Sequence, residues 1–118
     1  MPAAFVADER LKAIARDAVS AMADGIRCKE GLICTGDLFM CDPARVAKAR
    51  ADFPTMAAVE MEAAAIAQVC HQFQVPFVVT RSLYDIAGKE SPDSFEAYLE
   101  VAARHSSAMV VAMLQRMA

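Results

Sequence analysis

The stretch MAAVEMEAAAIAQVCHQFQVPFVVT (residues 56–80) carries the pattern that decides the fold. Its first residues, MAAVEM, are mostly apolar and predict a short buried strand. Apolar residues then recur at helical spacing from about Glu62 to Phe73. The next segment, VPFVVTRSLYDI (residues 75–86), has a β-branched centre and an entry proline, and it predicts a further strand. This strand–helix–strand order predicts a parallel sheet with helices on its faces.

The sequence before this stretch continues the same alternation. Apolar residues follow a helical repeat from Asp8 to Asp24, where Gly25 is a stop signal. The segment GLICTGDLFM (residues 31–40) predicts a short buried strand that ends at Thr35 and Gly36, with a loop after it. We therefore expect a helix and a strand ahead of the central stretch.

Two further helices are predicted from their end signals. Asp42 is suited to an N-cap, Pro43 to the first helical position and Pro54 to the residues just after the end, which predicts a short, mostly exposed helix. Asp93 and Glu96 have the spacing of a capping box, and the apolar residues beyond them predict a long C-terminal helix. Only three strands are predicted, whereas an average sheet has about five or six. The sheet therefore looks incomplete.

Composition excludes several classes of partner. The chain has 118 residues, a net charge of −3 and a pI near 5.3, so it lacks the basic field that binds nucleic acid. The longest apolar run, AMVVAML, is far shorter than the ~20 residues that cross a bilayer. The first residues, MPAAFVADERLK, lack the basic start and apolar segment that are typical of a signal sequence. We expect a cytoplasmic protein without membrane association. The cysteines have no CxxC spacing and only two histidines accompany them, so we expect no metal site. His71 and His105 lie in predicted helices without an evident partner, so we expect them to be surface or packing residues.

Polar residues occur at the ends of all three predicted strands. They lie in the segments TGDLF (residues 35–39), EME (residues 60–62) and RSLYD (residues 81–85). Ligands of open parallel sheets bind at the carboxyl ends of the strands, where these segments should meet. In an extended segment Glu60 and Glu62 would face one side and Met61 the other. The sequence thus predicts a cleft at this edge of the sheet.

Other interpretations of these residues remain open from the residue types alone. Glu60 and Glu62 are also suited to the N-terminus of a helix, where the macrodipole favours negative charge. Asp85 could cap a loop, and Arg81 could be a structural ion-pair partner for one of the acids. Phe39 could belong to the core.

Three segments resemble a known family. GLICTGDLFM, FPTMAAVEMEAAAIAQVCHQFQVPFVVTRSLYDIAG and SFEAYLEVAARHSSAMVVAML are similar to the C-terminal half of bacterial 5'-methylthioadenosine/S-adenosylhomocysteine nucleosidases, in the nucleoside phosphorylase superfamily. The resemblance implies an α/β fold, a partial nucleoside-phosphorylase-like three-layer structure with mostly parallel strands, flanking helices and a long C-terminal helix. Residues 1–118 would be the C-terminal half of a single domain, with the N-terminal half absent.

The resemblance also implies an activity. Family enzymes hydrolyse the N-glycosidic bond of adenine thionucleosides and release adenine, as homodimers without a metal or cofactor. It implies that Asp85 hydrogen-bonds the N7 side of the purine as general acid, which suits a leaving group that departs poorly as an anion. Glu62 would hold the ribose hydroxyls, and Met61 would pack under the sugar.

The remaining site residues follow from the same resemblance. Phe39 would stack on the purine, and the backbone of Met40 would read the edge of the base. Glu60 and Arg81 would form a supporting charged shell, and Phe95 would close the pocket over the ligand. The expected partners are a small purine nucleoside and either a second copy of the chain or a complementing N-terminal half.

Two departures from the family pattern bear on function. Tyr84 stands where family members usually have a small Ser, and its bulky phenol would reshape the purine pocket. The glutamate that activates water belongs to the N-terminal half, and nothing in this chain replaces it. A purine nucleoside phosphorylase or a hydrolase of a related adenine nucleoside is therefore an alternative. A non-catalytic binding or assembly fragment is an alternative of another class.

Overall fold

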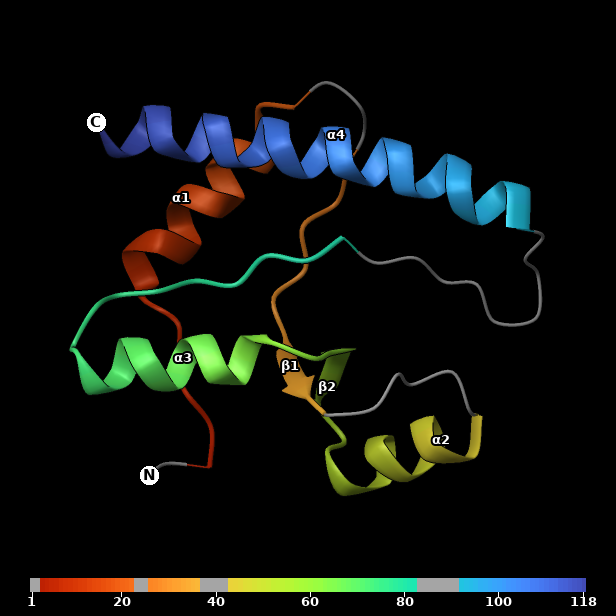
Figure 1. Cartoon of the computed structure of the whole chain (residues 1–118). Coiled ribbons are helices and arrows are strands. Elements are labelled where there is room, and N and C mark those ends of the chain that lie inside the picture. Colours follow the sequence, from red (N-terminus) through yellow and green to blue (C-terminus); the bar gives the residue numbers. More distant parts are fainter. Residues whose placement is uncertain (1–2, 23–25, 37–42, 83–91) are drawn as a thin grey trace. The chain divides into compact units, whose positions relative to one another are not determined.

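A computed structural model describes residues 3–22, 26–36, 43–82 and 92–118, with only the backbone described for 92–96. Its elements, in chain order, are α1 (Glu9–Ser20), β1 (Leu32–Thr35), α2 (Pro43–Asp52), β2 (Met56–Glu60), α3 (Ala63–Gln72) and α4 (Pro92–Met117) (Figure 1). They belong to two compact units. We call them the sheet unit (Met1–Asp8 and Lys29–Val79) and the helix unit (Glu9–Cys28 and Thr80–Ala118).

The sheet unit contains the predicted parallel pair of strands. β1 and β2 run parallel, and Thr35 lies opposite Glu60 at their carboxyl ends. The register is irregular between Leu32 and Ile33. Close to this irregularity, a Cβ placed on Gly31 would lie 2.5 Å from the Cβ of Ala57, so only glycine allows the two strands to approach in this way. The parallel arrangement predicted from the strand–helix alternation is confirmed for these two strands.

Helix α3 follows β2 directly and packs against β1. Its small residues Ala63 and Ala67 are buried, as the helical repeat predicts for the inner face. Ile66 and Val69, which the same repeat predicts to pack, are each 56% exposed instead. At its C-terminus the amide of Gln74 donates to the carbonyl of His71 at 3.3 Å, and that of Val75 donates to the carbonyl of Cys70 at 2.9 Å. This pair of bonds is a Schellman motif. Its left-handed position, usually a glycine, is Gln74 with φ 54°.

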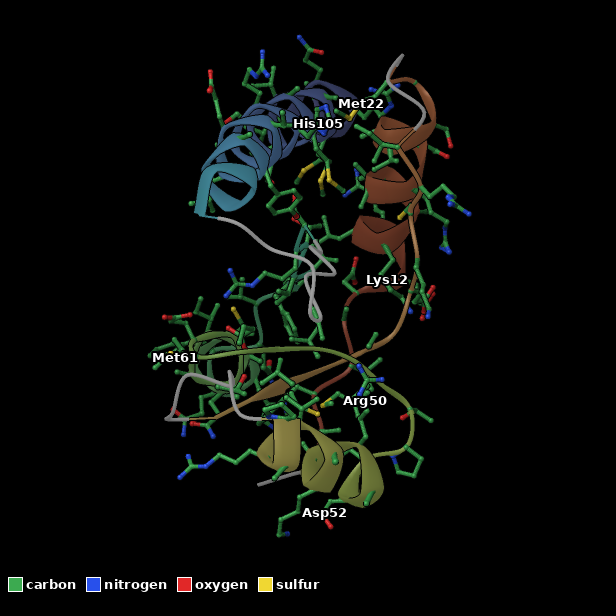
Figure 2. The ribbon with its side chains drawn as sticks, turned by 90° about the vertical axis from the view of Figure 1, so that its right-hand side faces the viewer. Lys12, Met22, Arg50, Asp52, Met61 and His105 are labelled. Carbon is green, nitrogen blue, oxygen red and sulfur yellow. The ribbon has the colours of Figure 1, made fainter. Side chains whose placement is uncertain are left out.

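Helix α2 is an exposed helix, as its end signals predict. It begins at Pro43 and ends at Asp52, just before Pro54, and none of its residues is buried. Lys48 and Asp52 form an ion pair of 2.8 Å along its surface, and Asp52 is labelled on its outer side in Figure 2. Asp42, the predicted N-cap, lies outside the described residues.

The third predicted strand is absent from the part of the chain that the structure describes. Residues 75–82 have an irregular backbone and belong to no sheet. A strand requires a neighbouring ladder, and the bond recorded here joins the carbonyl of Phe77 to the amide of Asp8 at 2.9 Å. A β-branched segment entered by Pro76 without a paired neighbour therefore stays irregular. The rest of the predicted strand, residues 83–86, lies outside the described residues.

The helix unit consists of α1 packed against the long helix α4 (Figure 1). Its buried residues are Ala15, Ala18 and Val19 of α1 and Met113 of α4. α1 ends at Ser20, earlier than predicted, and the predicted stop at Gly25 lies outside the described residues.

Helix α4 has the predicted length but a different first residue. It begins at Pro92, so the predicted N-cap residue Asp93 lies within the first turn instead. Proline is well suited to the first position of a helix because its φ is already helical and no amide is lost from the ladder. None of the helices described is long and apolar enough to cross a membrane.

Candidate functional site

The turn between β2 and α3 carries the predicted EME segment, and the side chain of Glu60 organises it. One carboxylate oxygen of Glu60, Oε2, accepts hydrogen bonds from the amides of Glu62 at 2.6 Å and Ala63 at 2.7 Å. The first amides of a helix have no partner within the helix and carry its positive end. Glu60 thus occupies the helix N-terminal role that was one of its two interpretations.

Thr35 completes the same network from the neighbouring strand. Its hydroxyl donates to the other carboxylate oxygen, Oε1 of Glu60, at 2.5 Å and accepts from the amide of Ala64 at 2.9 Å. The amide of Gly36 also donates to the carbonyl of Glu60 at 3.0 Å. These bonds join the end of β1, the end of β2 and the first turn of α3.

Glu62 and Met61 are both exposed at this turn. Glu62 is the N-cap residue of α3, but its side chain makes no capping bond because Glu60 already accepts from the nearby amides. Met61 is 44% exposed beside the start of α3 (Figure 2). β2 ends at Glu60 and residues 61–62 form a bend, so the strand alternation expected for the two glutamates does not extend to Glu62. The two carboxylates therefore have different surroundings.

The other predicted site residues belong to other parts of the chain. Arg81 is exposed and belongs to the helix unit, where its neighbour Ser82 lies 3.0 Å from Ser106, oxygen to oxygen. Phe95 lies in the first part of α4, where the backbone alone is described. Tyr84 and the remaining predicted site residues, Phe39, Met40 and Asp85, lie outside the described residues.

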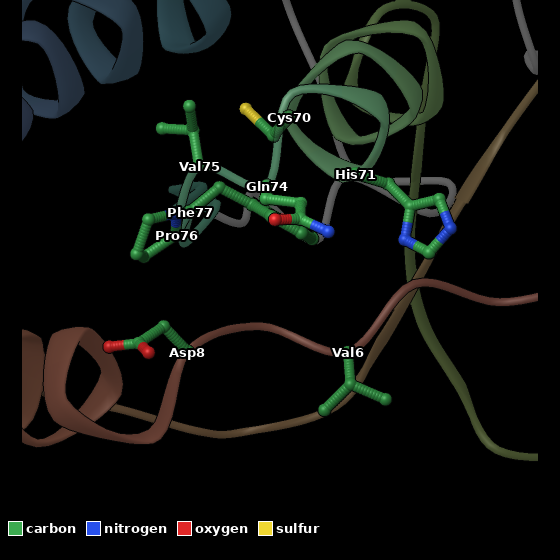
Figure 3. A pocket seen from close by; sticks show the side chains of 8 residues that line it. All are labelled: Val6, Asp8, Cys70, His71, Gln74, Val75, Pro76 and Phe77. Carbon is green, nitrogen blue, oxygen red and sulfur yellow. The ribbon is translucent and has the colours of Figure 1, made fainter.

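A separate open pocket of about 390 Å³ lies at the other end of α3 (Figure 3). The residues that line it are Val6, Asp8, Cys70, His71, Gln74, Val75, Pro76 and Phe77. None of the predicted site residues whose side chains the structure describes is among them. The ring of His71 packs edge-on against Phe5, with 5.4 Å between centroids, which is a packing role of the kind expected for this histidine.

The thiols and acids of the described residues do not form a metal cluster. Within the described ranges, no group of three or more His, Cys, Asp or Glu side chains could hold a metal ion. Cys28, Cys34 and Cys70 are free thiols, and burial raises the pKa of Cys34 in β1 above its ordinary value. A raised pKa keeps this thiol protonated and therefore less nucleophilic.

Thr35 is the member of the network that residue types alone did not identify. The sequence marked it only as one polar residue at a strand end. Its role depends on the register that places it opposite Glu60, and this register is not visible in residue types. A hydroxyl residue at the last position of a buried strand is the signal that could have suggested it.

The sequence matches a known family model and is similar to curated bacterial proteins. The family model described as Phosphorylase superfamily matches residues 1–115. The 5'-methylthioadenosine/S-adenosylhomocysteine nucleosidase of Pseudoalteromonas translucida is 59% identical over 117 residues, 99% of this chain and 49% of the relative. That of Tolumonas auensis is 60% identical over 116 residues, 98% of this chain and 50% of the relative. The chain spans about half the length of these relatives.

The fold is similar to those of solved nucleoside hydrolases. A nucleosidase of the same name from Colwellia psychrerythraea, solved in complex with adenine, has a TM-score of 0.84 and 58% identity, covering 97% of this chain and 47% of that one. The native futalosine hydrolase of Helicobacter pylori has a TM-score of 0.79 and 33% identity, covering 98% of this chain and 48% of that one.

Proposed function

Because this chain belongs to the phosphorylase superfamily, we propose that it is the purine- and ribose-binding half of a 5'-methylthioadenosine/S-adenosylhomocysteine nucleosidase. The proposed reaction is hydrolysis of the N-glycosidic bond with release of adenine. The observation that carries the proposal is the 58% identity, over nearly the whole chain, to a nucleosidase whose structure contains adenine. The exposed Met61 and Glu62 at the end of β2 are in a suitable place for a ligand.

In the proposed mechanism, Asp85 acts on the leaving base. Adenine is a poor leaving group as an anion, so a proton or a strong hydrogen bond from Asp85 to N7 lowers the barrier. The ribose gains positive charge as the bond breaks, and carboxylates near the sugar stabilise that charge. Glu62 holds the ribose hydroxyls, and Met61 packs under the sugar. Water attacks the anomeric carbon as the bond to adenine breaks, and it gives its proton to the glutamate that the resemblance places in the N-terminal half. The proposed reaction uses no metal or cofactor.

The remaining proposed contacts surround the base. Phe39 stacks on the purine, and the backbone of Met40 binds its edge. Phe95 closes the pocket at the start of α4. Glu60 and Arg81 support the site without contacting the reacting atoms. The hydrogen bonds from the first α3 amides to the Glu60 carboxylate agree with this indirect role for Glu60.

The proposal includes a second chain. We propose that residues 1–118 are the C-terminal half of one domain, acting in the cytoplasm either as part of a homodimer or with a complementing N-terminal half. The burial of the sheet unit supports this. Parallel strands are normally covered on both faces, yet every residue of β1 and β2 is only partly buried.

Adenine release tests the proposed function. The purified chain is incubated with 5'-methylthioadenosine, alone and with the first half of the Pseudoalteromonas translucida relative, and free adenine is measured by chromatography. We expect release in the mixture without added phosphate, and much less from the chain alone. Asp85→Asn is the matched variant, and it should lose most of the activity because its amide cannot donate a proton. No release from the mixture at high protein concentration would refute the proposal.

A second candidate is a hydrolase or phosphorylase of a related nucleoside. The likeness to futalosine hydrolase favours it, as does Tyr84 next to the proposed acid. Comparing futalosine with 5'-methylthioadenosine in the same assay would separate the two hydrolases, and dependence on phosphate would identify a phosphorylase. Nucleoside binding without turnover under all these conditions would indicate the non-catalytic fragment.

A further inference from the structure

One hydroxyl group connects the two strands to the helix that follows them. Thr35 is partly buried at the end of β1, and its Oγ1 both donates to Glu60 Oε1 and accepts from the amide of Ala64. A threonine or serine hydroxyl can do both at once, whereas a valine of the same shape can do neither. The position therefore needs a hydroxyl and not only its volume.

The hydroxyl also controls the direction of the Glu60 carboxylate. With Oε1 held by Thr35, Oε2 is directed at the amides of Glu62 and Ala63. Thr35 and Glu60 together thus bind the consecutive amides of residues 62, 63 and 64, which open α3. Those amides are the groups that a helix leaves without internal partners. The bend at Met61 and Glu62 is consequently fixed from both sides.

We propose that Thr35 is a positioning residue for the sugar side of the site. It acts through Glu60 and the α3 amides, and it fixes the backbone that presents Met61 and Glu62 to the ribose. This inference rests on the proposed function, in which Glu62 holds the ribose hydroxyls. A displacement of about 1 Å at such a contact is enough to weaken binding of the transition state strongly.

The proposed role of Thr35 concerns contacts to the sugar and not contacts to the base. The bonds of Thr35 and Glu60 reach the amides of residues 62–64, beside the residues proposed to contact the sugar, Met61 and Glu62. The proposed contacts to the base belong to other segments of the chain, which contain Phe39, Met40 and Asp85. Loss of the Thr35 hydroxyl should therefore weaken binding of a nucleoside more than binding of free adenine. General unfolding would weaken both alike, so the ratio of the two affinities distinguishes positioning from stability.

The experiment uses Thr35→Val and Thr35→Ser in the full chain, mixed with the first half of the Pseudoalteromonas relative if binding requires it. Calorimetry measures the affinities for 5'-methylthioadenosine and adenine, and NMR measures hydrogen exchange at the amides of residues 62–64. For Thr35→Val we expect about tenfold weaker nucleoside binding, adenine binding within about twofold, and about tenfold faster exchange at Ala64. Thr35→Ser should restore wild-type values in all three measurements.

Three other outcomes would contradict parts of the proposal. Unchanged nucleoside affinity in Thr35→Val, or an equal loss for adenine, would overturn the positioning role. Unchanged exchange at Ala64 would overturn the hydrogen-bond network itself, whatever the ligand result. If the unaltered protein binds neither adenine nor nucleoside, the proposed function fails and the role of Thr35 in it fails too, while the exchange result still reports on the network.

Discussion

Among the described residues, the helix unit buries Ala15, Ala18, Val19 and Met113, whereas the sheet unit buries Ala63 and Ala67. In the sheet unit, the bonds of Thr35 and Glu60 tie the strand ends to α3 instead. Apolar burial is stabilising wherever the side chain leaves water, but a polar network depends on each partner being present. The two units should therefore respond to different kinds of substitution.

Helix α3 adds a further contrast within the sheet unit. Its inner face carries alanines, while its large apolar residues Ile66, Val69 and Phe73 are 56%, 56% and 74% exposed. These three lie at i, i+3 and i+7, which is one stripe of the helix. A unit that exposes its large residues and buries its small ones has little apolar stabilisation of its own. This agrees with the proposal that more chain covers it.

The largest effect is expected from a charge in the helix unit. Ala18→Asp places a carboxylate at a position that is 0% exposed, and this should lower the free energy of unfolding by at least about 3 kcal/mol. Ala13→Asp is the control on the exposed face of the same helix, with the same helix propensity, and it should cost less than about 1 kcal/mol. Urea unfolding followed by circular dichroism measures both. Equal losses would contradict the apolar burial of α1.

The next effect concerns the polar network of the sheet unit. Glu60→Ala removes the acceptor of two α3 amides and the partner of Thr35, and it should cost about 2 to 3 kcal/mol. Glu62→Ala is the matched control, since that side chain makes no capping bond, and we expect about 0.5 kcal/mol. The same urea titration compares them. A greater loss in Glu62→Ala would reverse the assignment of the capping acid.

A smaller effect tests the close approach of the strands. Gly31→Ala would place its Cβ 2.5 Å from that of Ala57, and separating the backbones should cost about 1 to 2 kcal/mol. Gly36→Ala is the control, because nothing lies within 4 Å of its added Cβ. It should be neutral or slightly stabilising. Thermal melts of the two variants should thus shift in opposite directions or only for Gly31→Ala.

The smallest effect is a gain of stability. Gln74→Gly relieves the left-handed backbone at the end of α3, where φ is 54°, and it should add up to about 1 kcal/mol. Gln68→Gly, inside the same helix, should cost about 1 kcal/mol. The sign of the change in melting temperature is the readout. A loss of stability in Gln74→Gly would mean that the glutamine side chain contributes more than its backbone strain costs.

The helices and the two paired strands could be predicted because their signals are local. Pro43 is the first residue of α2, and Pro54 follows its last residue, Asp52, closely. The apolar repeat that predicts α3 lies within Ala63–Gln72. The third strand could not be judged in this way. Residues 75–80 have strand propensity, but a ladder requires a neighbour elsewhere in the chain, and propensity carries no information about that neighbour.

In the candidate site, too, some features follow from local sequence and others from distant partners. Residue order alone placed Glu60, Met61 and Glu62 at the end of a strand. The resemblance assigned Met61 and Glu62 to the sugar and Glu60 to a supporting shell. Only the tertiary structure decided that Glu60 turns to the α3 amides while Glu62 is exposed. The reason is that this choice depends on Thr35, which lies 25 residues from Glu60 in the chain and meets it only through the register of β1 and β2. Local pattern determines which element a residue joins, but partners distant in sequence determine where its charge points.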